Sequence, residues 1–190
     1  MITFDVEVIE MEKRVFITTF EEDSKSYQAF SELKQKHAKK DVNIEQMAVV
    51  MNNEEEKIQI KDFMDMTGPD RTSRGSIIGL LIGVLAGPLG MLLGWVSGTV
   101  IGAARDAREV KDALSVFEQT LSMISPGKTG LIIIADAESR NAIRTYIQDE
   151  LEGRLLQLDL DLVMQEIERA RETERELQKE ARKRMFEKKD

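Results

Sequence analysis

The first part of the chain alternates hydrophobic and polar positions in a way that predicts a strand followed by a helix. Residues 14–20 (RVFITTF) are rich in β-branched and aromatic residues, which is typical of a strand. Residues 24–40 place Tyr27, Phe30 and Leu33 on one helical face and end in basic residues, which favour a helix C-terminus. Two further strands are expected, over residues 43–51 (NIEQMAVVM) and around Ile58 and Ile60.

The last part of the chain predicts a helix, a strand, a helix and a strand. Apolar residues recur at helical spacing over 110–124, and Ser125-Pro126-Gly127 ends that helix. Residues 131–135 (LIIIA) form a continuous apolar run, as expected for a strand in the centre of a sheet. A helix over 138–151 and a short strand over 155–158 follow.

Between these two parts lies a run of 29 residues, Ser76 to Ala104, that contains no charge. Arg74 and Arg105 close it at either end. A run of this length is a transmembrane candidate, because a helix needs about 20 apolar residues to cross a bilayer.

Glycines in and beside this run recur at every fourth position, which places them on one helical face. Two ladders result: Gly75, Gly79, Gly83 and Gly87, then Gly90, Gly94, Gly98 and Gly102. Pro88 follows the first ladder and marks a turn. We expect two short helices packed glycine face to glycine face, because small residues let helix backbones approach closely. Three interpretations stay open: membrane insertion, burial between the subunits of a soluble oligomer, and a flexible linker.

The order of elements predicts the fold class. It is α+β: a ferredoxin-like βαββαβ sheet with an inserted glycine-zipper helical hairpin and a long C-terminal helix. The apolar strand over 131–135 needs neighbours from the first half, so both halves must lie on one side of any membrane. The zipper should therefore return as a hairpin, either dipping into one leaflet or spanning twice. The basic residues that flank it favour the cytoplasmic side: Arg71, Arg74, Arg105 and Arg108.

Five segments follow from this interpretation. They are an N-terminal extension and candidate edge strand (1–10), the first half of the sheet domain (11–72), the hairpin (73–106), the second half (107–160) and a charged helix (161–190). The extension lacks the basic start of a signal peptide. Whether Met1 or Met11 is the native start stays open.

Several pieces of the chain resemble one known family. They are FEEDSKSYQAFSELKQ, MAVV, DMTGPDRTSRGS, the zipper, and SPGKTGLIIIAD, which together cover 11–160. The family is a bacterial and archaeal domain of unknown function whose members are described as predicted membrane proteins, some of them as stress-related. The resemblance implies ferredoxin-like halves around a glycine-zipper hairpin, and membrane association. It implies no catalytic residue.

Composition and charge exclude several function classes. The chain has no cysteine and one histidine, which removes thiolate chemistry and makes histidine-based metal sites unfavourable. Its net charge of −8 argues against broad nucleic-acid binding. We predict no catalytic residue, no cofactor and no metal site, and we leave a small-molecule ligand open.

Three local patterns resemble functional sites but lack essential parts. Gly127-Lys128-Thr129 looks like the end of a P-loop, yet the required earlier glycine is replaced by Ser122. His37 has no identifiable catalytic partner. The acidic residues Asp62, Asp65 and Asp70 fit no calcium-loop spacing, so we expect a polar connector there.

The C-terminal helix carries a sparse apolar stripe and a basic end. We expect either a solvated helix or an arm that contacts another subunit, and the basic end is a candidate for contact with anionic lipid.

The leading functional hypothesis is a non-enzymatic membrane-associated protein that homo-oligomerises through the hairpin, with a structural or membrane-remodelling role under stress. It would act at the cytoplasmic face of the cell membrane, with itself and lipid as partners. The alternatives are a soluble cytoplasmic scaffold or shell with buried hairpins, and a pore former.

Overall fold

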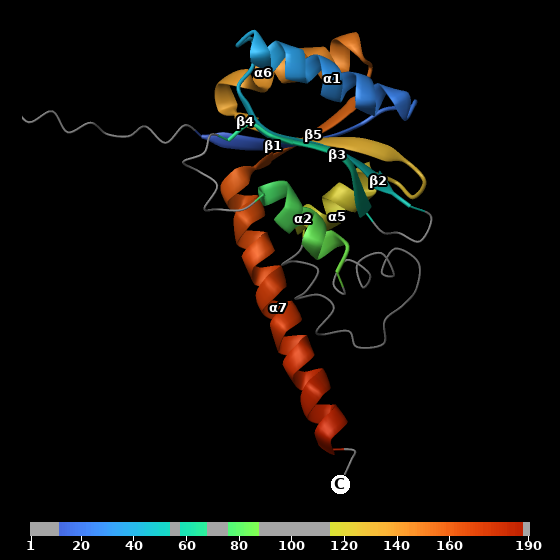
Figure 1. The fold of residues 1–190 in the computed structure, drawn as a ribbon, viewed down its shortest axis with the longest axis vertical. Helices are drawn as coiled ribbons and strands as arrows, with labels where there is room; N and C mark the ends of the chain where they lie inside the picture. The colour runs from blue at the N-terminus through green and yellow to red at the C-terminus, as the bar shows by residue number, and fades with distance from the viewer. Residues whose placement is uncertain (1–11, 54–57, 68–75, 88–114, 188–190) are drawn as a thin grey trace, which may run out of the picture.

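The computed structural model describes residues 12–53, 58–67, 76–87 and 115–187 (Figure 1). Its five strands form one antiparallel sheet in the order β3-β2-β4-β1-β5. The strands are β1 Lys13–Thr19, β2 Ile44–Asn52, β3 Ile58–Asp65, β4 Thr129–Asp136 and β5 Arg154–Asp159. The described residues therefore have an α+β fold.

Helical segments cover both faces of this sheet. They are α1 Ser24–Ala38, α2 Ile77–Leu85, α5 Ser115–Met123, η2 Ala137–Ser139, α6 Arg140–Arg144, η3 Thr145–Glu150 and α7 Leu160–Glu187. In Figure 1, α1 and α6 lie above the sheet, whereas α2, α5 and the start of α7 lie below it. The molecule thus has three layers, with the sheet in the middle.

The apolar run over 131–135 is the central strand, as its composition predicted. Every residue of β4 is buried, and β4 pairs with β1 on one side and β2 on the other. Both neighbours come from the first half of the chain, so the two halves share one sheet. A strand with helices on both faces needs apolar side chains at every position, which explains the unbroken LIIIA run.

Alternate residues of the central strands belong to two separate hydrophobic cores, one on each face of the sheet. Phe16, Met47 and Ile133 point up and pack with Phe30 and Tyr146 under α1 and η3. Their chain neighbours point down and pack with α2, α5 and α7: Val15, Ile17, Ala48, Ile132 and Ile134. This alternation follows from the two-residue period of a strand.

The connections place β3 at the edge of the sheet. α1 connects β1 to β2, and α6 with η3 connects β4 to β5, with both connections on the upper face. β4, rather than the strand around Ile58 and Ile60, lies between β1 and β2. The segment from β3 through α2 to α5 is therefore a long excursion between two strands that are hydrogen-bonded neighbours.

Three sequence-based expectations need correction in detail. Tyr27, expected in the buried face of α1, is 44% exposed. β3 continues to Asp65, so Asp62 and Asp65 lie in a strand instead of a connector. The helix expected over 138–151 is three consecutive pieces, because a 3₁₀ turn precedes α6 and a π-helical segment follows it.

Candidate functional site

The glycine-ladder helix α2 is fixed to the sheet at its first turn. The Ser76 hydroxyl caps it by accepting a hydrogen bond of 2.9 Å from the Gly79 N–H. The buried side chain of Gln46, on β2, accepts a second bond of 3.3 Å from the Ile78 N–H. Gln46 in turn donates to the Asp65 carboxylate at 3.1 Å. Two of the N–H groups that a helix start leaves free therefore have partners, one of them from the sheet.

α2 has an inner apolar face and an outer glycine face. Gly79 and Gly83 are both exposed. The larger side chains point into the lower core and are buried there: Ile78, Leu81, Ile82, Val84 and Leu85. Because residues four apart lie one above the other on a helix, the two glycines form a strip on which the backbone is accessible. This strip is the candidate functional surface, and we call it the glycine face.

The described glycines of the first ladder differ in what surrounds them. A Cβ built on Gly87 would lie 2.6 Å from Oε1 of Glu174 on α7, at the end of a flexible side chain, and 3.0 Å from the Gly83 carbonyl oxygen. A Cβ on Gly79 would meet only the capping Ser76, at 3.3 Å. A Cβ on Gly83 would meet no heavy atom of the described residues within 4 Å. Gly87 therefore lies in close contact with α7, whereas no contact within the described residues requires a glycine at position 83.

The remaining predicted site residues lie outside the described part of the chain. They are Gly75, Gly90, Gly94, Gly98, Gly102, Pro88, Arg71, Arg74, Arg105 and Arg108. Most of the proposed hairpin is therefore untested, and only its first arm, α2, is described as a helix.

α7 contacts the chain just before and just after residues 88–114. Gly87, after α2, lies against Glu174. Val116, in the first turn of α5, donates its N–H to the buried carboxylate of Glu166 at 2.8 Å. Glu166 and Glu174 are eight residues apart, which is about 12 Å along a helix. The chain thus leaves and re-enters the described structure beside one short stretch of α7.

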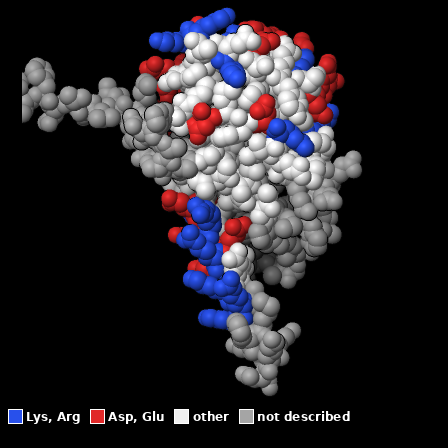
Figure 2. All heavy atoms as spheres, in the orientation of Figure 1, with Lys and Arg blue, Asp and Glu red and all other residues white. Residues whose placement is uncertain are grey.

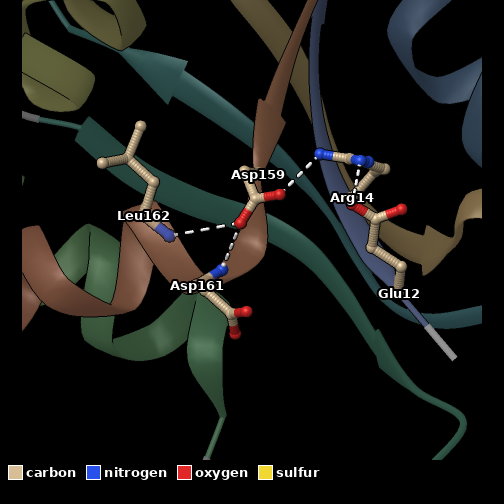
Figure 3. A network of polar contacts seen from close by, with 5 residues as sticks. All are labelled: Glu12, Arg14, Asp159, Asp161 and Leu162. Carbon is tan, nitrogen blue, oxygen red and sulfur yellow. Dashed lines mark hydrogen bonds and ion pairs between the residues drawn. The ribbon is translucent and has the colours of Figure 1, made fainter. Parts of the chain in front are cut away.

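The start of α7 is held by a polar network at the sheet edge (Figure 3). Asp159 accepts bonds from the N–H groups of Asp161 at 2.9 Å and Leu162 at 3.4 Å, and so caps the helix. Its other oxygen pairs with Arg14 on β1 at 2.6 Å, and Arg14 also contacts Glu12. This network joins the first turn of α7 to β5 and β1 and fixes where the helix begins.

The turn that resembles a P-loop has a structural role. Asn52 donates to the Ile124 carbonyl at 2.8 Å and accepts from the Gly127 N–H at 2.7 Å. Gly127 has φ +79°, which favours glycine. The Lys128 ammonium donates to the Glu21 carbonyl at 3.3 Å. The groups that would hold a phosphate therefore close the turn and pin it to the loop before α1.

His37, Asp62 and Asp65 are also part of the scaffold, whereas Asp70 lies outside the described residues. His37 accepts a bond of 3.1 Å from the Ile44 N–H through Nδ1. The Asp62 and Asp65 carboxylates accept bonds from nearby N–H groups and from Gln46. Across the described ranges, no group of three or more His, Cys, Asp or Glu side chains is arranged to hold a metal ion.

One polar cluster of the upper face was not anticipated. The Tyr146 hydroxyl donates to the Glu32 carboxylate at 2.8 Å, and the Lys36 ammonium lies 4.9 Å from the centre of the Tyr146 ring. Burial, together with the Glu32 charge, raises the pKa of Tyr146 well above its ordinary value. Hydrogen bonds from Gln28 and Tyr146 lower the pKa of Glu32. The cluster joins η3 to α1.

Sequence analysis also missed three buried or capping polar residues, namely Gln46, Glu166 and Asp159. Gln46 and Glu166 occupy apolar-periodic positions of β2 and α7, and each is at most 3% exposed. A polar residue at a buried position needs a partner, so this mismatch was the available signal. Asp159 immediately precedes a helix, which is a capping signal.

One known family matches the chain over the segment that contains this site. Residues 72–179, more than half of the chain, match the family described as "Protein of unknown function (DUF1269)". The chain belongs to this family. The DUF1269 match begins before α2 and ends within α7, so it includes both glycine ladders, α5, β4 and β5. It does not include β1, α1, β2 and β3, which the expected resemblance over 11–160 did.

No curated protein and no solved structure matches the chain significantly. Among the helices of the described residues, none is both long and apolar enough to cross a membrane.

Proposed function

We propose that this protein is a non-enzymatic structural protein whose copies assemble through the glycine-zipper hairpin at a membrane surface. In this proposal β2, β4, β1 and β5, with α1 and α6 on one face, form a ferredoxin-like platform. β3 is an additional edge strand, and the hairpin is inserted between β3 and α5.

The observation that carries the proposal is the outward glycine face of α2. Each glycine inside a helix costs about 0.8–1 kcal/mol relative to alanine. Gly83 has no neighbour among the described residues that would require a glycine there. A second helix packed against Gly79 and Gly83 would offset that cost, because small residues allow close backbone contact.

Anchoring of α2 limits how the hairpin can meet lipid. Five apolar side chains of α2 are buried in the core of the subunit, so this arm keeps little apolar surface for a bilayer. The uncharged run continues for 17 further residues, 88–104. That length is too short to cross a hydrocarbon core of about 30 Å twice. Of the two membrane arrangements expected from the sequence, the proposal therefore favours a shallow dip into one leaflet, on the side of the basic flanks.

The same anchoring favours a second candidate, a soluble homo-oligomeric scaffold. A helix whose apolar face is already buried needs no lipid to cover it. In this alternative the glycine faces pack on each other between subunits, and assembly proceeds in water.

Light scattering after size-exclusion chromatography tests assembly in two conditions. One is detergent-free buffer alone, and the other is the same buffer with added vesicles. We expect wild-type protein to have a mass several times that of the monomer, and Gly83→Leu to reduce it because a leucine holds the helices apart. Gln35→Leu is the matched control, since it adds an exposed leucine to α1 on the opposite face. A monomeric wild type under both conditions, or a Gly83→Leu protein of unchanged mass, would contradict the proposal. Assembly in the absence of vesicles would favour the soluble scaffold.

A further inference from the structure

The second half of α7 stands clear of the domain. Val163, Ile167 and Ala170 are buried against the lower core, whereas beyond Ala170 the described side chains are exposed or, at Thr173 and Glu174, half-buried. Figure 1 shows this part of α7 projecting away from the sheet. A helix that leaves its domain is available to another surface.

One face of this projecting part carries a row of cations. Arg171, Arg175, Lys179 and Lys183 follow each other at intervals of four, and all are exposed. Residues at this spacing lie on one slowly turning face, so the row extends for about 18 Å. Figure 2 shows basic side chains along α7. We call these four residues the basic row.

The end of the basic row, Lys179 and Lys183, lies in a stretch of the chain that is rich in cations. Residues 179–189 contain six Lys or Arg and two Glu, while the rest of the chain contains 21 basic and 33 acidic residues. The C-terminal end is therefore cationic on a protein that is otherwise strongly anionic. An anionic surface would attract this end and repel the remainder of the protein.

The basic row begins where the uncharged run leaves the described structure. Gly87, which ends the described part of that run, lies against Glu174. Arg171 and Arg175 flank Glu174 in α7. Two cations of the basic row therefore lie within one helical turn of the residue that contacts Gly87, the last described residue of the uncharged run.

We propose that the basic row binds the anionic headgroups of a lipid bilayer. The proposal rests on the proposed membrane association and adds a lipid preference to it. Glu172 and Glu176 lie on the flank of the row and are exposed, so they weaken its attraction to an anionic surface. Juxtamembrane Lys and Arg residues gain about 1 kcal/mol each near an anionic surface, or about fivefold in partitioning.

Vesicle flotation with the full chain tests this proposal. The variant replaces Arg171, Arg175, Lys179 and Lys183 by Gln, which is a good helix former. The control replaces four exposed cations by Gln, in α1, at its C-cap and in α6: Lys34, Lys39, Arg140 and Arg144. Both variants lose four positive charges, so a difference in vesicle binding between them shows that the position of the cations matters. Vesicles contain phosphatidylcholine alone or a mixture with phosphatidylglycerol, and circular dichroism checks that α7 remains helical.

We expect wild type and control to bind phosphatidylglycerol vesicles at least about tenfold better than phosphatidylcholine vesicles, with the preference lost at high salt. The basic-row variant should lose this preference and keep the wild-type affinity for phosphatidylcholine. Equal binding of the variant and wild type, equal losses in variant and control, or indifference of wild type to headgroup charge would overturn the inference. A salt-sensitive self-association without lipid would also overturn it, because the basic row would then bind acidic residues of a second copy of the chain. The Gly83→Leu mass measurement is independent of headgroup charge, so failure of the lipid preference leaves assembly standing.

Discussion

The side-chain carbonyl of Gln46, inside the sheet, accepts a hydrogen bond of 3.3 Å from the backbone N–H of Ile78, at the start of the glycine-ladder helix. This contact lies in a buried region between two segments that are 32 residues apart. It fixes the first turn of α2 on β2, and the apolar face of α2 then lies on the lower core. The glycine face points outward as a consequence.

Replacing Gln46 by Leu should undock the start of α2. The change leaves the Ile78 N–H without its buried acceptor and removes one of the donors to the Asp65 carboxylate, so we expect a loss of about 1–3 kcal/mol in the free energy of unfolding. Urea denaturation measures this loss. Gln59→Leu on exposed β3 is the matched control and should change stability by at most about 0.5 kcal/mol. Equal effects of the two substitutions would exclude the anchoring role.

Two substitutions of Asp159 should separate its capping role from its ion pair. Asp159→Ala removes the cap of α7 and the partner of Arg14, and we expect a loss of about 2 kcal/mol. Asp159→Asn keeps an oxygen acceptor for the helix N–H groups and weakens only the ion pair, so its loss should be about half as large. Hydrogen exchange of the first turn of α7 reports the cap directly. Asp161→Ala, in the same turn, is the control, and a loss as large as that of Asp159→Ala would argue against a specific cap.

The same glycine-to-alanine substitution should have opposite effects at two positions. Gly83→Ala adds a methyl group to an exposed helix position and should stabilise the isolated subunit by up to about 1 kcal/mol. Gly130→Ala places a Cβ 2.7 Å from Cδ1 of Ile124 and 2.8 Å from the Thr18 carbonyl oxygen, so we expect a loss of about 2 kcal/mol. Thermal unfolding in dilute protein compares the two. A destabilised Gly83→Ala subunit would mean that the glycine face is already packed within one chain.

The contact between Tyr146 and Glu32 should make stability fall at alkaline pH. The raised pKa of Tyr146 means that the folded state keeps the phenolic proton at a pH where the unfolded chain, with a pKa of about 10, loses it. The stability that depends on this proton is complete below about pH 10 and is lost as the pH rises further. Tyr146→Phe should cost about 1 kcal/mol at pH 7 and a smaller amount at pH 11.

Thermal unfolding of this variant at the two pH values gives the difference directly. Tyr27→Phe, at the exposed tyrosine, is the control and should show no such pH dependence. A cost of Tyr146→Phe that stays constant or grows with pH would contradict the assignment of the alkaline loss to this hydroxyl.

Local patterns were sufficient to predict most of the elements. Alternation and β-branched residues gave β1, β2 and β5 to within one or two residues, and the unbroken LIIIA run identified β4 as a central strand. The four-residue spacing of glycines correctly predicted a helix at α2. These features depend on the periods of helices and strands, which are properties of neighbouring residues.

The sequence by itself therefore determined where most of the described helices and strands lie, and which segments carry glycine or charge. Only the tertiary structure decided that β4 lies between β1 and β2, that β3 lies at the edge, and that Gly87 and Glu174 meet. It also decided that Gln46 and Glu166 hold the first turns of α2 and α5. The physical reason is that strand order and partner choice depend on contacts between residues far apart in the chain, which no local period encodes. The outward direction of Gly83 is one result, because it follows from where the opposite face of α2 is buried.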